Sequence, residues 1–358
     1  MNYSYNTIKN IELEISTYCN AACPQCVRNN FGGSTISNLP LINWTLEKLQ
    51  QILTVELVKQ LDMVYFCGTY GDPMANAYIV NMCKWLRATN NKLTIGMHTN
   101  GGLGKSKTYQ DLAKYVDFIA FGIDGLEDTN HLYRRNVQWE KVIKNARSFI
   151  QSGGRAVWDF IVFEHNEHQV EQAQQLSVDI GFQEFNVKKT GRFFNKAHKL
   201  VDSVNVLDKN GNKEYTLKLP KNSKYINSGY NDLYKLDFTK YVKTTNIHCY
   251  WMHNNMVYVG ADGYVFPCGF LHDRLYGVES QQTQDYKKIL EWIQDVGEIS
   301  ANAFLSSLEY VINGPWFKKI QESWVTGPLE RCAFLCGEHV NLLSSQNSTI
   351  KYKIDLHK

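Results

Sequence analysis

Residues 15–30 read ISTYCNAACPQCVRNN and carry three cysteines, Cys19, Cys23 and Cys26, within eight positions. They follow residues 11–16 (IELEIS), whose alternating apolar side chains predict a β-strand. Structural zinc needs four closed ligands and catalytic zinc usually recruits histidine or carboxylate, whereas no histidine lies near this loop. A [4Fe–4S] cluster normally takes four protein ligands, so three thiolates leave one iron open. The spacing therefore favours an iron–sulfur cluster that can bind a further molecule.

The composition is that of an ordinary globular protein. The 358 residues suffice for one large domain and a smaller one, with 44% hydrophobic and 20% charged residues. A formal net charge of +3 indicates neither a nucleic-acid partner nor a membrane partner. The first 16 residues lack the apolar segment of a signal peptide, and no window resembles a membrane helix. We therefore expect a cytoplasmic protein whose nine cysteines serve mainly as metal or cluster ligands rather than in disulfides.

Strand and helix patterns alternate over the first 190 residues. Strands are expected at 11–16, 63–68, 92–99, 117–123, 156–163 and 184–190, and helices at 45–60, 77–89, 106–115, 139–151 and 167–178. This order indicates right-handed βαβ units and a parallel sheet. The units are too few for an eight-fold barrel, and the Gly-rich fingerprint of a dinucleotide fold is missing. We predict an α/β fold with a partial (β/α)6 TIM-like barrel, whose active groups gather at the C-terminal ends of the strands.

The pattern changes after residue 190. Hairpins are expected at 204–219 and 256–268, a surface connection at 222–247, and helices at 283–296, 301–312 and 315–325. We predict a core domain at 1–200, a hairpin and connecting segment at 201–247, and a smaller α+β domain at 248–358.

The cysteine loop also resembles a known family. Cys19-x3-Cys23-x2-Cys26 after a first strand is similar to the signature of the radical S-adenosylmethionine (SAM) superfamily, except that Gln25 replaces the usual aromatic residue. The resemblance covers about residues 11–190. It implies that SAM binds the open iron and is cleaved reductively to a 5′-deoxyadenosyl radical, which abstracts a hydrogen atom from the substrate. A reductase such as flavodoxin or ferredoxin would supply the electron.

Further motifs at predicted strand ends resemble the SAM contacts of that family in the same order. Residues 70–73 are similar to its Gly-Gly-Glu-Pro element, and 98–102 (HTNGG) and 121–128 (FGIDGLED) to later elements. The resemblance implies that SAM is held by Tyr70, Gly71, Asp72, Pro73, Thr99, Asn100, Asp124, Arg134, Arg135 and Asn166. The alternatives are a plain turn at 71–73, solvated arginines at 134–135 and a helix N-cap at Asn166.

A second group of cysteines lies near the C-terminus: Cys249, Cys268, Cys332 and Cys336. The spacing Cys249-x13-Gly263-x4-Cys268 resembles the opening of SPASM/Twitch auxiliary-cluster domains. Four cysteines fit the shorter Twitch form, which implies one fully ligated auxiliary [4Fe–4S] cluster. A structural zinc site is the alternative. The remaining Cys67 and Cys83 are expected to be buried apolar residues.

An auxiliary cluster would suit an oxidation, because it can accept an electron from a substrate radical. The analogy with Twitch relatives implies oxidation of a sugar-like or cyclitol alcohol. The basic, aromatic segment 186–199 suggests an anionic small molecule, or else is a solvated linker. Radical SAM modification of a peptide or protein side chain is the first alternative, and a non-catalytic zinc-binding module is the second. The sequence identifies no catalytic base.

Overall fold

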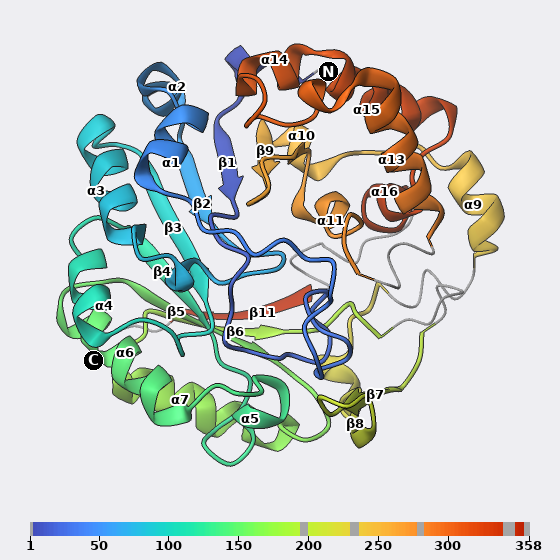
Figure 1. Cartoon of the computed structure of the whole chain (residues 1–358). Helices are drawn as coiled ribbons and strands as arrows, with labels where there is room; N and C mark the ends of the chain where they lie inside the picture. The colour runs from blue at the N-terminus through green and yellow to red at the C-terminus, as the bar shows by residue number, and fades with distance from the viewer. Residues whose placement is uncertain (1–2, 194–199, 230–235, 278–282, 339–347, 354–358) are drawn as a thin grey trace. The chain divides into compact units, whose positions relative to one another are not determined.

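The computed structural model describes residues 3–193, 200–229, 236–277, 283–338 and 348–353. Within these ranges the chain forms a mostly parallel sheet of nine strands in the order β10-β9-β1-β2-β3-β4-β5-β6-β11 (Figure 1). Its end pairs, β10–β9 and β11–β6, are antiparallel. The strands are β1 Asn10–Leu13, β2 Met63–Phe66, β3 Thr94–Thr99, β4 Phe118–Gly122, β5 Ala156–Ile161, β6 Glu184–Lys188, β9 Met256–Val259, β10 Val265–Phe266 and β11 Thr349–Lys353. The predicted α/β class and mainly parallel sheet are confirmed.

The chain divides into two compact units. Unit 1 consists of Met1–Tyr18, Ile36–Ile95 and Leu236–Val340, and unit 2 of Cys19–Thr35, Gly96–Lys235 and Asn341–Lys358. Both units combine early and late parts of the chain. The domain boundaries expected from the sequence remain a prediction.

Unit 1 contains β1, β2, β9 and β10. Its helices are α1 Leu46–Ile52, α2 Val55–Gln60, α3 Ile79–Thr89, α9 Phe238–Thr244, α10 Tyr250–His253, α11 Gly269–His272, α13 Gln284–Val296, α14 Leu308–Asn313, α15 Pro315–Thr326 and α16 Glu330–Cys336, with 3-10 turns η1 Tyr5–Thr7, η2 Pro73–Ala75 and η5 Glu298–Ser300. The helix expected at 45–60 is broken in two because the hydroxyl of Thr54 accepts a hydrogen bond from the backbone N–H of Leu57 and starts α2.

The expected hairpin at 256–268 is present, but its pairing adds a feature that the sequence did not predict. Strand β9 lies parallel to β1, with Asn10 opposite Met256 and Leu13 opposite Val259. The hairpin therefore extends the same sheet as the first strand. Helix α9 falls inside the segment expected to be a surface connection, and α16 was not expected.

Unit 2 contains β4, β5, β6 and β11. Its helices are α4 Ser106–Leu112, α5 Asn130–Tyr133, α6 Trp139–Gln151 and α7 Val170–Ile180, with 3-10 turns η3 Glu167–Gln169 and η4 Ser223–Tyr225. One sheet face is apolar and fully buried. On this face Phe121, Trp158 and Phe185 lie opposite one another on the neighbouring strands β4, β5 and β6. The opposite face carries polar residues, and alternation along each strand separates the two sets.

Unit 2 also contains the predicted hairpin between 204 and 219. It consists of β7 Ser203–Leu207 and β8 Lys213–Lys218, which pair antiparallel. Gly211 in the connecting turn has a φ of +87°, a conformation that glycine adopts without strain.

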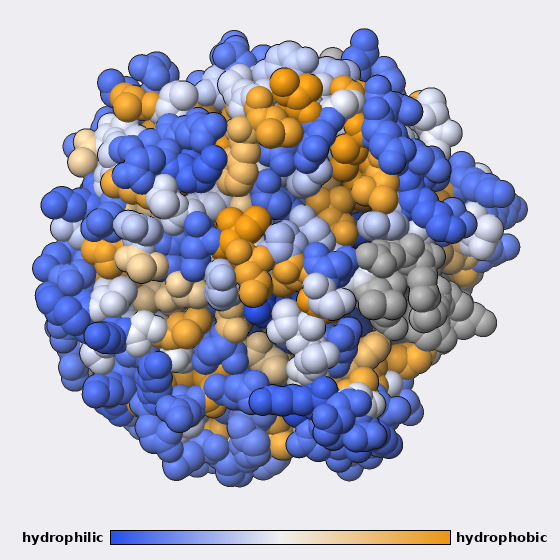
Figure 2. Space-filling model, viewed as in Figure 1, coloured by the Kyte–Doolittle hydropathy of each residue, from blue (hydrophilic) through white to orange (hydrophobic). Residues whose placement is uncertain are grey.

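Among the described helices, none is long and apolar enough to cross a membrane. The face drawn in Figure 2 is mainly hydrophilic, with apolar patches scattered over it. Such a mixture is normal for the surface of a folded domain.

Candidate functional site

The three-cysteine loop lies in unit 2, and side chains that donate hydrogen bonds lie next to two of its thiols. Cys23 is buried, whereas Cys19 and Cys26 are half-buried. The side-chain amide of Asn100, just beyond β3, donates to Sγ of Cys19 at 3.5 Å. The guanidinium of Arg134 donates to Sγ of Cys23 at 3.8 Å. These donors suit thiolates that carry negative charge, so the loop fits an iron–sulfur cluster.

Arg134 connects this loop with the end of β4. Its Nε lies 2.6 Å from Oδ2 of Asp124, whose side chain is fully buried. Burial raises the pKa of Asp124, and Arg134 opposes that shift. Burial likewise raises the pKa of Cys23 to about 11, again opposed by Arg134. One guanidinium therefore serves both a carboxylate and a thiol.

The same guanidinium occupies the space beside Gly122 at the end of β4. A Cβ atom on Gly122 would lie 2.3 Å from Nη2 of Arg134 and 3.2 Å from Cε1 of His98. A side chain at this position would therefore displace Arg134.

Other expected SAM contacts of unit 2 make hydrogen bonds within the protein. Asn166 donates to the carbonyls of Asp124 and Ile161 and accepts from the backbone N–H of Phe163. Arg135 pairs with Glu214 of β8 at 2.7 Å. Thr99 is buried and accepts from the backbone N–H of Gly101. The structure thus brings Asn100 and Arg134 to the cysteine loop, and the SAM roles of these residues stay predictions.

Residues 70–73 lie in unit 1 after β2 and form a tight, buried turn. A Cβ atom on Gly71 would lie 1.9 Å from the carbonyl oxygen of Ser16, so only glycine fits. Asp72 caps η2 by accepting from the backbone N–H of Met74 at 2.9 Å, and Pro73 is the first residue of that turn. These contacts match the expected turn, and the SAM contact of the same residues remains a prediction.

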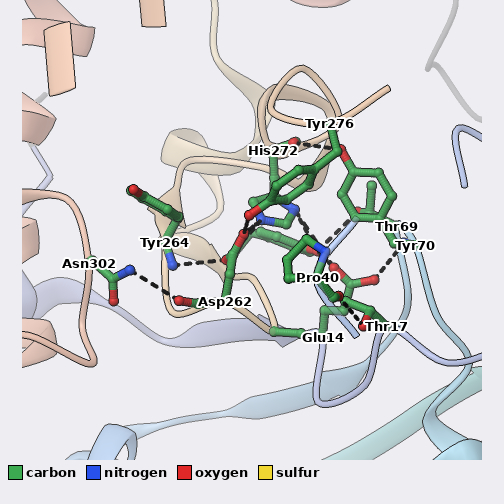
Figure 3. Close-up of polar contacts among 12 residues, drawn as sticks. Glu14, Thr17, Pro40, Thr69, Tyr70, Asp262, Tyr264, His272, Tyr276 and Asn302 are labelled. Carbon is green, nitrogen blue, oxygen red and sulfur yellow. Dashed lines mark hydrogen bonds and ion pairs between the residues drawn. The ribbon is translucent and has the colours of Figure 1, made fainter. Parts of the chain in front are cut away.

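A buried carboxylate fixes the backbone of this turn. Oε1 of Glu14, just after β1, accepts hydrogen bonds from the N–H groups of Tyr70 and Gly71 at 2.5 and 2.9 Å (Figure 3). Oε2 of Glu14 accepts from the hydroxyl of Tyr258 on β9 at 2.7 Å. Because Glu14 has no exposed surface, these donors compensate the desolvation of its carboxylate.

His272 of α11 extends the network toward the β9–β10 turn. Its Nδ1 lies 3.7 Å from Oε2 of Glu14, and its Nε2 lies 2.9 Å from Oδ2 of Asp262 (Figure 3). Burial alone would lower the pKa of His272, but the two carboxylates raise it overall. The hydroxyl of Tyr276 donates to Asp262 at 2.7 Å. Sequence reasoning missed this network, because the local pattern indicates Asp262 only as a turn residue.

The polar face of the unit 2 sheet carries a second cluster that the sequence did not reveal. Asp159 of β5 lies 3.8 Å from Nε2 of His98 and 3.5 Å from Nζ of Lys188, and it accepts from the side-chain amide of Asn186 at 2.9 Å. Partial desolvation lowers the pKa of His98 to about 4 although 35% of its side chain is exposed, so the imidazole is neutral near pH 7. Strand alternation places all four residues on one face, a signal that was available in the sequence.

The basic segment 186–199 is described only to residue 193. Nη1 of Arg192 donates to the carbonyl of Gln25 at 2.9 Å, and the amide of Gln25 donates back to the carbonyl of Arg192 at 3.3 Å. This segment therefore contacts the three-cysteine loop within unit 2. The predicted contributions of Phe194, Lys196 and Lys199 lie outside the described residues.

The four C-terminal cysteines come together in unit 1. Cys249, Cys268, Cys332 and Cys336 all line one small cavity, together with mainly apolar side chains such as Trp251 and Leu271. The first three thiols are buried and the fourth is half-buried. Within the ranges given above, no group of three or more His, Cys, Asp or Glu side chains is arranged to hold a single metal ion. The four predicted ligands thus line one cavity, and their role in holding a cluster stays a prediction.

Hydrogen bonding and burial affect these thiols differently. A hydrogen bond from Cys336 lowers the pKa of Cys249 to about 7, whereas burial raises the pKa of Cys268 and Cys332 well above the ordinary value. Cys67 is half-buried and Cys83 is fully buried.

Comparisons with known proteins agree with this geometry. Residues 13–176 match the model of the Radical SAM superfamily. Streptococcus suis SuiB bound to precursor peptide SuiA is similar at a TM-score of 0.52 and 14% identity, covering 91% of this chain and 77% of that chain. Histidine-tagged anSMEcpe with bound AdoMet is similar at a TM-score of 0.50 and 14% identity, covering 89% and 94% of the two chains. BtrN in complex with AdoMet and 2-DOIA has a TM-score of 0.47 and 12% identity, with 97% and 98% covered. A comparison with curated proteins found no match.

Residues 13–176 of the chain therefore match a radical SAM superfamily domain. The likeness to SuiB and anSMEcpe shows a shared fold. The family implies a [4Fe–4S] cluster and SAM as cofactors, and the donors around Cys19 and Cys23 fit such a cluster.

Proposed function

We propose that this radical SAM enzyme oxidises a hydroxylated small molecule with the help of an auxiliary [4Fe–4S] cluster in a Twitch-like domain. The observation that carries the proposal is the convergence of Cys249, Cys268, Cys332 and Cys336 on one largely apolar cavity. Four thiolates close the coordination of a cluster, which then serves electron transfer rather than substrate binding.

The three-cysteine loop would hold the cluster that binds SAM. When both are bound, they supply the one-electron cleavage of SAM to methionine and a 5′-deoxyadenosyl radical, which removes a hydrogen atom from a C–H bond. Asn100 and Arg134 would stabilise the thiolates of Cys19 and Cys23 through the hydrogen bonds described above. Glu14 would hold the backbone of Tyr70 and Gly71 in position for the amino group of SAM.

Oxidation of an alcohol then needs an acceptor. An alcohol carbon that has lost one hydrogen atom becomes a carbonyl by losing one further electron and the hydroxyl proton. The four C-terminal thiolates would hold the group that accepts the electron. The neutral imidazole of His98, which lies 3.8 Å from Asp159, is our candidate acceptor for the proton.

The polar sheet face of unit 2 supports a hydroxylated substrate. His98, Asp159, Asn186 and Lys188 offer both donors and acceptors, as a polyol or sugar requires. The side chains of His98 and Lys188 are 35% and 34% exposed, so a ligand can reach them. Lys188 and Arg192 would also favour a phosphorylated or otherwise anionic substrate.

The proposal is tested by metal analysis and a substrate screen. Iron, sulfide and zinc are measured after anaerobic reconstitution of wild type, of C19A/C23A/C26A and of C249A/C268A/C332A/C336A. We expect about two [4Fe–4S] clusters in wild type and about one in each variant. Zinc in place of iron at the C-terminal site would overturn the electron-acceptor role.

The substrate screen uses wild type with SAM and dithionite. Sugars and cyclitols, with and without phosphate, are incubated beside synthetic peptides, and 5′-deoxyadenosine and oxidised product are quantified. Carbonyl formation from a polyol supports the proposal. If only a peptide gives a product, the proposed alcohol substrate is wrong. That result would support the alternative, modification of a peptide side chain, which the precursor peptide bound to SuiB suggests.

A further inference from the structure

Three buried hydrogen-bond donors in the four-cysteine region of unit 1 have no oxygen or nitrogen acceptor. Among the described residues, these are the hydroxyl of Tyr3, Nε1 of Trp324 and Nε of Arg331, and the first two interact only with the thiols of Cys249 and Cys332. Leaving a buried donor unsatisfied is unfavourable, so native proteins rarely tolerate several in one place. Their grouping indicates that something which accepts hydrogen bonds belongs there.

The donors lie beside two parts of the ligand set, Tyr3 beside Cys249 and Cys268, and Trp324 and Arg331 beside Cys332. The hydroxyl of Tyr3 interacts electrostatically with Cys249 and Cys268. Trp324 of α15 and Arg331 of α16 both line the cavity, and the indole of Trp324 faces the thiol of Cys332. The donors therefore come from three separate segments.

Packing holds these donors in place. The ring of Tyr3 packs edge-on against Phe317 with centroids 5.0 Å apart, and its backbone N–H donates to Gln321 at 3.2 Å. Nη2 of Arg331 is paired with Asp273 at 3.0 Å, which leaves Nε for another acceptor. The positions of the first and third donors thus follow from their own contacts and do not require a ligand.

The missing acceptor has a definite chemistry. A [4Fe–4S] cluster with four thiolates is anionic, and its sulfur atoms accept hydrogen bonds from N–H and O–H groups. Such bonds strengthen when the cluster gains an electron, because the negative charge grows, so they raise its reduction potential. A guanidinium beside the cluster acts in the same direction.

We propose that Tyr3, Trp324 and Arg331 form a donor set that binds the sulfur atoms of the auxiliary cluster and raises its reduction potential, making it an electron acceptor. This inference rests on the auxiliary cluster of the proposed function. It assigns to the N-terminal residue Tyr3 a role at a site whose ligands all lie beyond residue 248.

The test measures the potential of the auxiliary cluster alone. C19A/C23A/C26A removes the other cluster, and Tyr3→Phe or Trp324→Phe is added to this background. Each reconstituted protein is titrated with dithionite and mediators while the one-electron reduction is followed by EPR. Tyr310→Phe, whose side chain is 50% exposed, is the matched control.

We expect Tyr3→Phe and Trp324→Phe each to lower the equilibrium constant of reduction about tenfold, or ~59 mV for one electron, and Tyr310→Phe to leave it unchanged. Potentials equal to that of the control would overturn the donor role while leaving the cluster in place. Absence of a cluster from the background itself would instead overturn the proposed function. Tyr3→Phe removes only a hydroxyl, so it carries the test if Trp324→Phe fails to fold.

Discussion

The two cysteine sites of this chain differ in ligand number, exposure and neighbours. The loop with Cys19, Cys23 and Cys26 has three thiols on one short segment, two of them half-buried. The four C-terminal thiols come from three separate segments of unit 1 and line a mainly apolar cavity. The first arrangement leaves room for a further ligand, whereas the second closes around whatever it holds.

Their hydrogen-bond donors differ in the same way. At the loop, Asn100 and Arg134 already contact thiols directly. At the cavity, the donors of Tyr3, Trp324 and Arg331 have no oxygen or nitrogen acceptor among the described residues. Under the proposed function, the loop that would bind SAM is thus completed by protein contacts, whereas the closed site would be completed by its cluster. The following experiments test this contrast.

The largest effect is expected from removing one ligand set at a time. C19A/C23A/C26A should lose SAM cleavage to below detection, because no open iron remains to bind SAM. C249A/C268A/C332A/C336A should still form 5′-deoxyadenosine with dithionite, within about tenfold of wild type, because the loop is in the other unit. Chromatographic quantification of 5′-deoxyadenosine measures SAM cleavage in both variants. Equal loss in both variants would contradict a division of labour between the sites.

Removal of Arg134 should destabilise the fold strongly. Arg134→Gln leaves the buried carboxylate of Asp124 without its ion pair, which we expect to lower the free energy of unfolding by about 3–5 kcal/mol. Arg135→Gln is the matched control, because its partner Glu214 is half-exposed and such pairs contribute about 0–1 kcal/mol. Urea unfolding of the two variants measures the difference. If both variants lose a similar amount of unfolding free energy, the ion pair of Arg134 with Asp124 does not stabilise the fold and Arg134 acts only at the cysteine loop.

A smaller effect is expected at the tight turn after β2. Gly71→Ala would force a Cβ atom against the carbonyl of Ser16 and lower the free energy of unfolding by about 1–3 kcal/mol. SAM affinity, measured by equilibrium dialysis, should also fall if this turn holds the amino group. Gly191→Ala is a suitable control, because its Cβ would meet nothing closer than Asn227 at 3.9 Å. Unchanged SAM affinity in a folded Gly71→Ala protein would argue against the predicted contact.

The smallest effect is a pH dependence of stability caused by His272. Its pKa in the folded state is raised above the ordinary value of about 6.5, mainly by Asp262, against the effect of burial. The stabilisation is therefore fully present below about pH 6.5 and is lost as the pH rises through the folded-state pKa. From about pH 6 to about pH 9, wild type should lose more stability than His272→Gln. The free energy of unfolding is measured by urea unfolding at each pH. If it changes with pH equally in wild type and in His272→Gln, the pKa of His272 does not change on folding.

Local sequence patterns predicted the strands of the main sheet up to β6, because alternation and βαβ order are short-range signals. The helix at 139–151 has the predicted bounds, since it ends in a Ser-Gly-Gly sequence that stops helices. Strand β11 and the parallel pairing of β9 with β1 were missed, because each joins segments far apart in the chain. Periodicity within one segment carries no information about such partners.

The same distinction applies to the candidate sites. Cysteine spacing identified both thiol sets, because each has recognisable local intervals. The buried network of Glu14, His272 and Asp262 was missed, since Glu14 lies far from the other two along the chain and none belongs to a motif. The polar cluster around His98 and Asp159 was missed although strand alternation could have indicated it.

The pairing of β9 with β1 has a consequence for how this chain can be shortened. Deleting the C-terminal part from residue 248 would strip Asn10–Leu13 of a hydrogen-bonded neighbour and leave this strand at an open sheet edge, where unpaired backbone groups promote aggregation. It would also take the phenol of Tyr258 away from Glu14, whose carboxylate holds the turn at Tyr70. The first 247 residues therefore depend on the later segment for one neighbouring strand of β1 and for one hydrogen bond to Glu14.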